Sequence, residues 1–205
     1  MSAYEHLLEV SGADPSRTVF VGDSAGGALV LQTMTLARKR GLPLPAAGVL
    51  LSPWVDLQED TSSASSWERN AKYDYLPRGI GPMLADLYRG DAGWDEINPM
   101  KMSGEDLRRL PPLYVEAGEC EVFLDQINAF VGRMRAHGAT PVDYRVRRDM
   151  VHVHQMFYGT GMPQCAESFA DIATFCRRAV GCPACDRDSD VTSRTDGGSS
   201  DTSDS

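Results

Sequence analysis

A serine between two glycines is the first residue whose surroundings suggest chemistry. Residues 19–27 read Val-Phe-Val-Gly-Asp-Ser-Ala-Gly-Gly, so a short hydrophobic run stops at Gly22 and Ser24 follows two residues later. Gly-x-Ser-x-Gly between a strand and a helix is the pattern of a nucleophile elbow, which exposes the serine hydroxyl at the end of the strand. We predict that Ser24 is a nucleophile. The alternative is an idle serine in a tight turn.

The elbow pattern also makes demands on the residues around the serine. Its backbone must take a sparsely populated conformation, and we expect side chains at Gly22 and Gly26 to clash with that turn. A helix-forming run over residues 28–34 follows at once. The Ala25 N–H and the positive end of that helix dipole would then face an oxyanion, so Ala25 is the predicted oxyanion donor.

A serine nucleophile needs a histidine as base, and the base needs an acid that orients it. Of the four histidines, His6 precedes the serine and His137 falls in the last turn of a predicted helix, where an imidazolium is favourable by itself. His152 and His154 follow the last predicted strand. We predict that His152 is the base and that His154 is a surface histidine, turned the other way in an extended loop.

The orienting acid is expected in the loop after the predicted strand 113–117. That loop offers three carboxylates, on Glu119, Glu121 and Asp125. Glu119 comes early, and Asp125 lies one helical turn past Glu121, pointing away from the strand ends. We select Glu121 and keep Asp125 in reserve, with an ion pair or a helix N-terminal charge as the alternative role for each.

Four strands must position these residues. Continuous apolar runs at 47–51 and 113–117 predict buried strands, 18–21 feeds the elbow, and the charged positions within 142–146 suit a sheet edge. Helices are expected over 4–10, from Ser24 to Arg40, over 122–136 with Phe123, Ile127, Phe130, Val131 and Met134 facing the core, and over 164–180 with Cys165, Phe169, Ile172, Cys176 and Ala179 on one face. These elements predict an α/β fold with a mostly parallel sheet of about four strands, flanked by helices.

The domain organisation follows from composition. Residues 1–180 are expected to form one domain, with an insert over about 58–110 that is either a lid over the pocket or surface packing. Residues 181–205 contain six Asp and two Arg and almost no apolar residues, so they carry −4 of the net charge of −9. We expect this acidic Ser/Thr/Asp tail to be disordered.

Charge, hydropathy and cysteines limit the partners. A net charge of −9 argues against nucleic acid and anionic membranes, which need a basic face. No apolar run approaches the roughly 20 residues that span a bilayer. Five scattered cysteines favour a reducing compartment, so we expect a cytoplasmic protein. The C-x-x-C at Cys182 and Cys185 lacks further zinc ligands nearby, and we predict no metal site.

Four stretches together resemble a known family. They are Gly22-Asp23-Ser24-Ala25-Gly26-Gly27, Ser52-Pro53-Trp54-Val55-Asp56-Leu57, the loop from Gly118 to Asp125, and the segment from Met150 to Phe157. In this order they resemble the hormone-sensitive-lipase-like α/β-hydrolases, from about residue 4 to residue 180. The resemblance implies a carboxylesterase without metal or organic cofactor, acting on small-molecule esters, with Ser24, Glu121 and His152 at the family's catalytic positions.

The sequence also departs from the family. Family members carry a His-Gly-Gly-Gly segment well upstream of the elbow, which supplies further oxyanion donors, and the 205 residues contain none. We therefore expect a partial fold that lacks the amino-terminal half. The strand 18–21 would then be an open apolar edge, which favours self-association. The alternative to an esterase is a catalytically impaired remnant with a binding role; a receptor-like binder ranks last, and a peptidase on the same fold stays open.

Overall fold

One parallel sheet forms the centre of the molecule. The computed structural model describes residues 2–58, 65–77, 79–138 and 141–182. Within them the sheet has the order β1-β2-β3-β4 and every neighbouring pair is parallel. Its strands are β1 (Val19–Asp23), β2 (Ala47–Leu51), β3 (Leu113–Gly118) and β4 (Val142–Arg147). The predicted α/β class and the four predicted strands are confirmed, with end points within two residues.

The two central strands are buried along their whole length. Every residue of β2 and β3 is buried, as their continuous apolar runs predict for strands covered on both faces. The exception in composition is Glu116, a carboxylate in the middle of β3 with no exposed surface. In contrast β4 is partly exposed, which agrees with its charged positions and its place at one edge of the described sheet.

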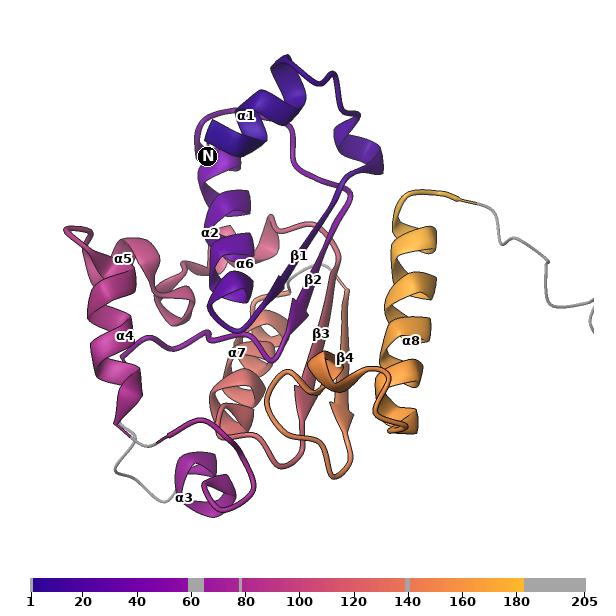
Figure 1. Cartoon of the computed structure of the whole chain (residues 1–205). Coiled ribbons are helices and arrows are strands. Elements are labelled where there is room, and N and C mark those ends of the chain that lie inside the picture. Colours follow the sequence, from indigo (N-terminus) through magenta and orange to yellow (C-terminus); the bar gives the residue numbers. More distant parts are fainter. Residues whose placement is uncertain (1, 59–64, 78, 139–140, 183–205) are drawn as a thin grey trace, which may run out of the picture.

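Helices cover both faces of the sheet. The helices α2 (Ala25–Lys39) and α7 (Leu124–Ala136) lie on one face, and α8 (Pro163–Ala179) lies on the other (Figure 1). Apolar side chains of α2 and α7, such as Met34 and Phe130, form the larger core cluster with alternate residues of β2 and β3. The smaller cluster joins the opposite side of β2 and β3 to α8. The sheet is therefore held between two apolar layers.

The buried face of α8 differs from the expected one. Three of the expected residues pack against the sheet, namely Ile172, Cys176 and Ala179, and Cys165 is buried as well. Phe169, in contrast, is 42% exposed. In its place Phe175 packs into the core, with its ring 5.7 Å from that of Tyr114. Phe169 shares the helix face of Cys165 and Ile172, but its ring packs edge-on against Tyr158 at 5.1 Å, outside the sheet. The acidic tail from residue 183 onward lies outside the described residues.

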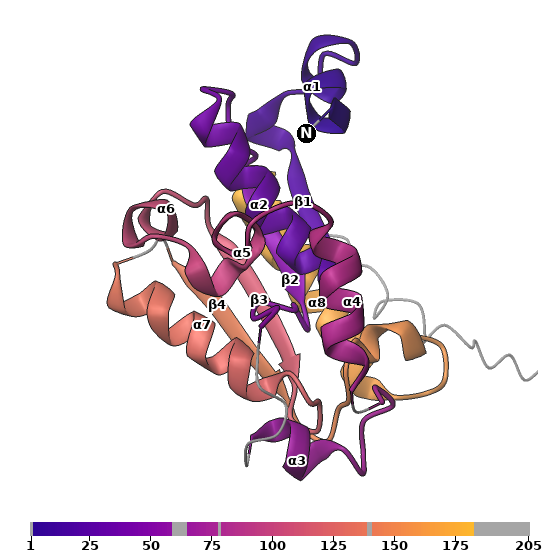
Figure 2. The ribbon, with the colours of Figure 1, turned by 90° about the vertical axis from the view of Figure 1, so that its left-hand side faces the viewer.

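The segment between β2 and β3 contains short helices in its described parts. It contains α3 (Ser66–Asn70), α4 (Ile80–Arg89), α5 (Trp94–Ile97), η2 (Pro99–Lys101) and α6 (Gly104–Arg108). Figure 2 shows α4 and α5 on the α2 side of the sheet, whereas α3 lies beyond the ends of the strands. The Tyr88 hydroxyl donates to Gln32 of α2, and Arg38 of α2 pairs with Asp106 of α6. These contacts attach α4 and α6 to α2, while α3 lies near the strand ends.

The amino-terminal elements are short. The helix α1 (Ser2–Glu9) packs Tyr4 edge-on against Phe20 of β1, and η1 (Pro15–Arg17) leads into that strand. Among the described residues, no helix combines the length and the apolar character needed to cross a membrane.

Candidate active site

The turn between β1 and α2 places Ser24 at the carboxyl end of the sheet. Ser24 has φ 50° and ψ −121°, a conformation that a side-chain-bearing residue rarely takes. Two hydrogen bonds hold it there, because its N–H donates to the carbonyl of Leu51 and its own carbonyl accepts from the N–H of Trp54, both at 2.9 Å. The last residue of β2 and the turn after it thus hold the strained serine at both its N–H and its carbonyl.

The glycines of the elbow have unequal roles. A Cβ at Gly22 would lie 2.3 Å from the Gly26 carbonyl oxygen, and one at Gly27 would lie 2.5 Å from the Pro53 Cβ. A Cβ at Gly26 would meet nothing within 4 Å. The expected clash is therefore present at Gly22 but not at Gly26. The tight contact on the helix side falls at Gly27, where the helix crosses close to Pro53.

Gly22→Ala and Gly26→Ala form a matched test of this turn. Gly22→Ala is expected to lower the stability by about 1–3 kcal/mol, because its Cβ must displace backbone atoms. Gly26→Ala should raise stability by up to about 1 kcal/mol, since alanine favours a helix over glycine. Thermal unfolding of both variants measures this, and equal midpoints would show that the turn is not tight at Gly22.

His152 faces Ser24 from the loop after β4. Its Nε2 lies 3.0 Å from the Ser24 Oγ, within hydrogen-bond reach, and its side chain is almost wholly buried. The Phe123 ring stands edge-on to the imidazole at 4.9 Å, and the Tyr75 ring is tilted against it at 6.0 Å. Aromatic rings on two sides limit the rotation of the imidazole and keep water from it. The residues after α3 thus contribute Tyr75 to the site.

Glu121 lies behind the imidazole. Its side chain is fully buried, and its Oε1 is 3.9 Å from the Nδ1 of His152. Neither of these two atoms has a hydrogen-bond partner among the described residues. The other carboxylate oxygen, Oε2, accepts from the Gly118 N–H at 2.7 Å and from the Ser52 hydroxyl at 2.5 Å. The 3.9 Å contact between Glu121 and His152 is longer than a hydrogen bond, but catalytic contacts often shorten when substrate binds.

The other two carboxylates of this loop have different partners. Asp125 accepts from the Ser66 N–H at 2.8 Å and pairs with Arg69, so it ties α7 to α3. Glu119 accepts from the Asp149 N–H at 3.1 Å. Asp125 thus joins two helices and Glu119 joins two loops. Neither carboxylate contacts the imidazole of His152 among the described contacts.

Ser52 is a further site residue that had no predicted role. It is fully buried with φ 45°, and its hydroxyl accepts from the Val153 N–H at 3.0 Å while donating to Glu121. One hydroxyl thus connects the acid to the residue after His152. The available signal was its position, because Ser52 directly follows the buried strand β2, as Ser24 and Glu121 follow β1 and β3.

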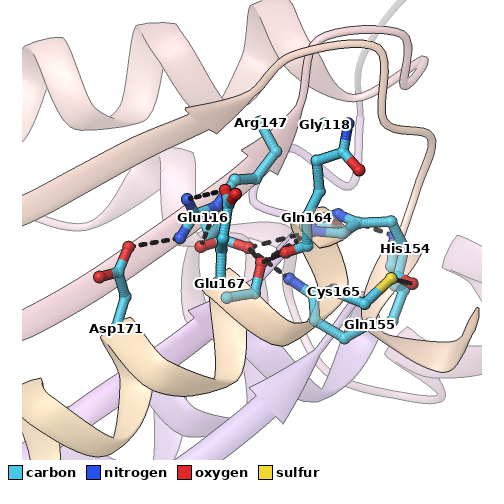
Figure 3. A network of polar contacts seen from close by, with 12 residues as sticks. Glu116, Gly118, Arg147, His154, Gln155, Gln164, Cys165, Glu167 and Asp171 are labelled. Atoms are coloured by element: carbon cyan, nitrogen blue, oxygen red, sulfur yellow. Dashed lines mark hydrogen bonds and ion pairs between the residues drawn. The ribbon is translucent and has the colours of Figure 1, made fainter. Parts of the chain in front are cut away.

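His154 does not lie at the surface. The segment after His152 is not extended but forms the 3-10 helix η3 (His154–Phe157), which turns the His154 ring into the protein. His154 has no exposed surface, and its Nε2 lies 2.9 Å from the Ser168 Oγ and 3.2 Å from the Glu116 Oε1 (Figure 3). The surface prediction was therefore wrong, because a buried carboxylate and a hydroxyl from α8 lie against the His154 Nε2 inside the protein.

The start of α2 supplies a donor for an anion. As the first residue of α2, Ala25 has an N–H without an acceptor within the helix, and the positive end of the helix dipole adds to it. Its neighbour Ser24 carries the hydroxyl that faces His152. A tetrahedral oxyanion formed on Ser24 would therefore lie beside this N–H.

Acyl transfer is the chemistry that this arrangement would suit. A hydroxyl, an imidazole at hydrogen-bond distance and a buried carboxylate on the far side of the ring form the arrangement of a serine hydrolase. Among the described residues, no group of three or more His, Cys, Asp or Glu side chains is arranged to hold a metal ion.

Comparison with known proteins identifies the family. Residues 1–156 match a protein family that is described as having the alpha/beta hydrolase fold. The chain is 33% identical to an acetyl-hydrolase of Streptomyces hygroscopicus over 88% of its own length, and 31% identical to an esterase of Acinetobacter venetianus over 84%. It covers 58% and 55% of those two proteins, respectively.

Solved structures give the same result. An esterase from the bacterial hormone-sensitive lipase family is 37% identical, with a TM-score of 0.75, and the match covers 88% of this chain and 59% of that one. A hormone-sensitive lipase from a metagenome library is 34% identical, with a TM-score of 0.74 over 87% and 58%. The chain thus spans less than two thirds of these proteins, which agrees with a partial fold. It belongs to the hormone-sensitive-lipase-like family of α/β-hydrolases.

Proposed function

We propose that the chain carries the catalytic serine, acid and histidine of a carboxylesterase. The observation that supports this most strongly is the 3.0 Å approach of the His152 Nε2 to the Ser24 Oγ, with Glu121 behind the ring. Ser24 and His152 are separated by 128 positions in the sequence, yet they meet at the carboxyl end of one sheet. The names of the relatives, acetyl-hydrolase and esterase, support a carboxylic ester as the substrate.

The proposed reaction has two halves. The Ser24 Oγ attacks the ester carbonyl carbon while its proton passes to the His152 Nε2, and Glu121 stabilises the imidazolium through Nδ1–H. The oxyanion accepts a hydrogen bond from the Ala25 N–H. When it collapses, the C–O bond to the alcohol breaks and His152 returns the proton to that oxygen. A water molecule, activated by His152, then hydrolyses the acyl-serine and restores Ser24.

The number of oxyanion donors decides between an active and an impaired site. Loss of one donor typically lowers turnover by about 10²–10³-fold, and the 205 residues contain no His-Gly-Gly-Gly segment of the kind that supplies further donors in the family. The second candidate function is therefore a binding protein that keeps the serine, acid and histidine but turns over little substrate.

Hydrolysis of short-chain nitrophenyl esters separates the two functions. We expect the 205-residue chain alone to be slow, and a family segment with His-Gly-Gly-Gly, fused in front of it or added separately, to raise kcat by about 10²–10³-fold. The same segment with its glycines replaced by bulky residues is the control. Brisk turnover without the segment would exclude the impaired protein, whereas no turnover in either form would contradict the esterase.

We also propose that the chain associates with itself through β1. In the described sheet β1 is an edge strand, and Val21 is 59% exposed. A groove of about 430 Å³ adjoins it, lined by apolar residues of α1, β1 and α2 such as Leu7, Phe20 and Leu29. An open apolar edge of this kind supports pairing with a second copy.

We further propose that the protein is cytoplasmic. The four cysteines within the described residues, Cys120, Cys165, Cys176 and Cys182, all carry free thiols. Free thiols are typical of proteins in a reducing compartment, which supports this location.

A further inference from the structure

The residue after His152 is strained. Val153 has φ 45° and ψ 47°, the left-handed region, which a β-branched residue rarely enters. This conformation turns the chain from the His152 loop into η3, and its energetic cost requires that the surroundings hold it in place. Because Val153 is bonded to His152, relaxation of this turn would move the imidazole relative to the Ser24 Oγ.

Contacts on both sides hold the turn. On one side the Val153 N–H donates to the Ser52 Oγ at 3.0 Å. On the other side the next two residues, His154 and Gln155, both reach the Glu116 Oε1, with the Gln155 Nε2 donating at 2.7 Å and the His154 Nε2 at 3.2 Å (Figure 3). The start of η3 is thus attached to a single carboxylate oxygen in the middle of β3.

That carboxylate is a firm attachment point. Its other oxygen, Oε2, accepts from the Tyr114 hydroxyl and from the Arg147 Nε at 3.1 Å. Burial alone raises the pKa of Glu116, but hydrogen bonds from His154, Ser168 and Tyr114, together with the Arg147 charge, outweigh burial and lower the pKa to about 2. Glu116 therefore stays anionic at neutral pH, and charge-assisted hydrogen bonds of this kind are strong.

We propose that Glu116 is a positioning residue for His152, which acts by anchoring Gln155 and His154 and so maintaining the turn at Val153. The inference rests on the proposed function, because its consequence for turnover requires His152 to be the base. The contrasting explanation is that Glu116 only ties α8 to the sheet, through Ser168 of that helix and through Arg147, which pairs with Asp171.

Gln155→Met tests the attachment without removing the charge. The Gln155 Oε1 has no hydrogen-bond partner among the described residues, so methionine of similar length removes only the Nε2 donor to Glu116. The matched control is Tyr114→Phe, which removes a donor to the other oxygen of the same carboxylate and does not touch the His152 loop. If Gln155→Met does not fold, Gln155→Leu removes the same Nε2 donor with another apolar side chain.

Two readouts are compared in both variants, namely kcat and KM for a nitrophenyl ester and the ¹⁵N chemical shifts of the His152 imidazole. We expect Gln155→Met to lower kcat by about 10- to 100-fold at nearly unchanged KM, because displacement of a catalytic group by about 1 Å has effects of this size. The imidazole shifts should change as well. Tyr114→Phe should leave kcat within about twofold and the imidazole shifts as in the wild type.

Either of two results would overturn the proposal. One is an unchanged kcat with unchanged imidazole shifts in Gln155→Met, and another is an equal loss of kcat in both variants that follows their loss of thermal stability. If the wild-type chain shows no turnover even with the His-Gly-Gly-Gly segment supplied, the proposed function fails first. The imidazole shifts, which need no turnover, then still decide whether Glu116 positions His152.

Discussion

Ser24→Ala is expected to lower kcat for a short-chain nitrophenyl ester by about 10⁴-fold or more. The reason is that the Ser24 hydroxyl is the only proposed acyl acceptor, and the loss of a serine nucleophile in a hydrolase has effects of this size. The substitution removes one oxygen atom, so the strained turn and the rest of the site should persist. Steady-state hydrolysis, with thermal unfolding to confirm the fold, measures the effect.

Ser103→Ala provides the matched control for this substitution. Ser103 is an exposed serine that caps α6 by accepting from the Asp106 N–H, so its loss affects a helix end remote from the elbow. Its kcat should equal that of the wild type. If Ser24→Ala retained wild-type turnover while remaining folded, acyl transfer through this serine would be excluded.

His152→Ala is expected to have the second largest effect, a loss of about 10⁴-fold in kcat. Without the imidazole, no described group at hydrogen-bond distance takes the proton of the Ser24 hydroxyl, and Glu121 loses the ring that it orients. Groups that act as a unit are not additive, so Ser24→Ala in combination with His152→Ala should be no slower than either single variant. Hydrolysis by the three variants measures this directly.

The control for the histidine is His137→Ala. His137 is exposed at the end of α7 and has no place in the proposed reaction. The His137→Ala variant should keep the kcat of the wild type. Additive losses in the double variant would indicate that Ser24 and His152 act in separate processes, against the proposed mechanism.

Much of the fold could be predicted from local sequence patterns. The four strands follow from apolar runs and turn residues, and the elbow follows from Gly22 and Ser24, whose spacing fits a strand-to-helix turn. The order of serine, acid and histidine along the chain then led to Glu121 and His152, which lie at the ends of β3 and β4. The strand predictions succeeded because each depends on a few neighbouring residues, whereas the catalytic roles of Ser24, Glu121 and His152 stay predictions.

Contacts between distant segments could not be predicted in this way. The Ser52 hydroxyl becomes informative only when Val153 and Glu121 are placed beside it. His154 looked like a surface residue because a charged or polar side chain in a loop normally lies in water. Its burial depends on Glu116 in β3 and Ser168 in α8, which sequence periodicity does not connect.

The same limitation explains the error in α8. Helical periodicity places Phe169 and Ile172 on one stripe, but of these two residues Ile172 alone packs against the cluster that joins α8 to the sheet. Tyr158, just after η3, covers the Phe169 ring, while Phe175 reaches Tyr114 in the core. A rule based on spacing alone therefore identified the helix but not all of its buried residues.

The most direct test of the central claim is the site at which a fluorophosphonate probe reacts. The claim is that the Ser24 hydroxyl is activated by His152, which predicts a covalent adduct on the peptide that contains Ser24, found by mass spectrometry. The adduct should form far more slowly in His152→Ala and not at all in Ser24→Ala. An adduct on another serine, or equal labelling of all three proteins, would contradict the account.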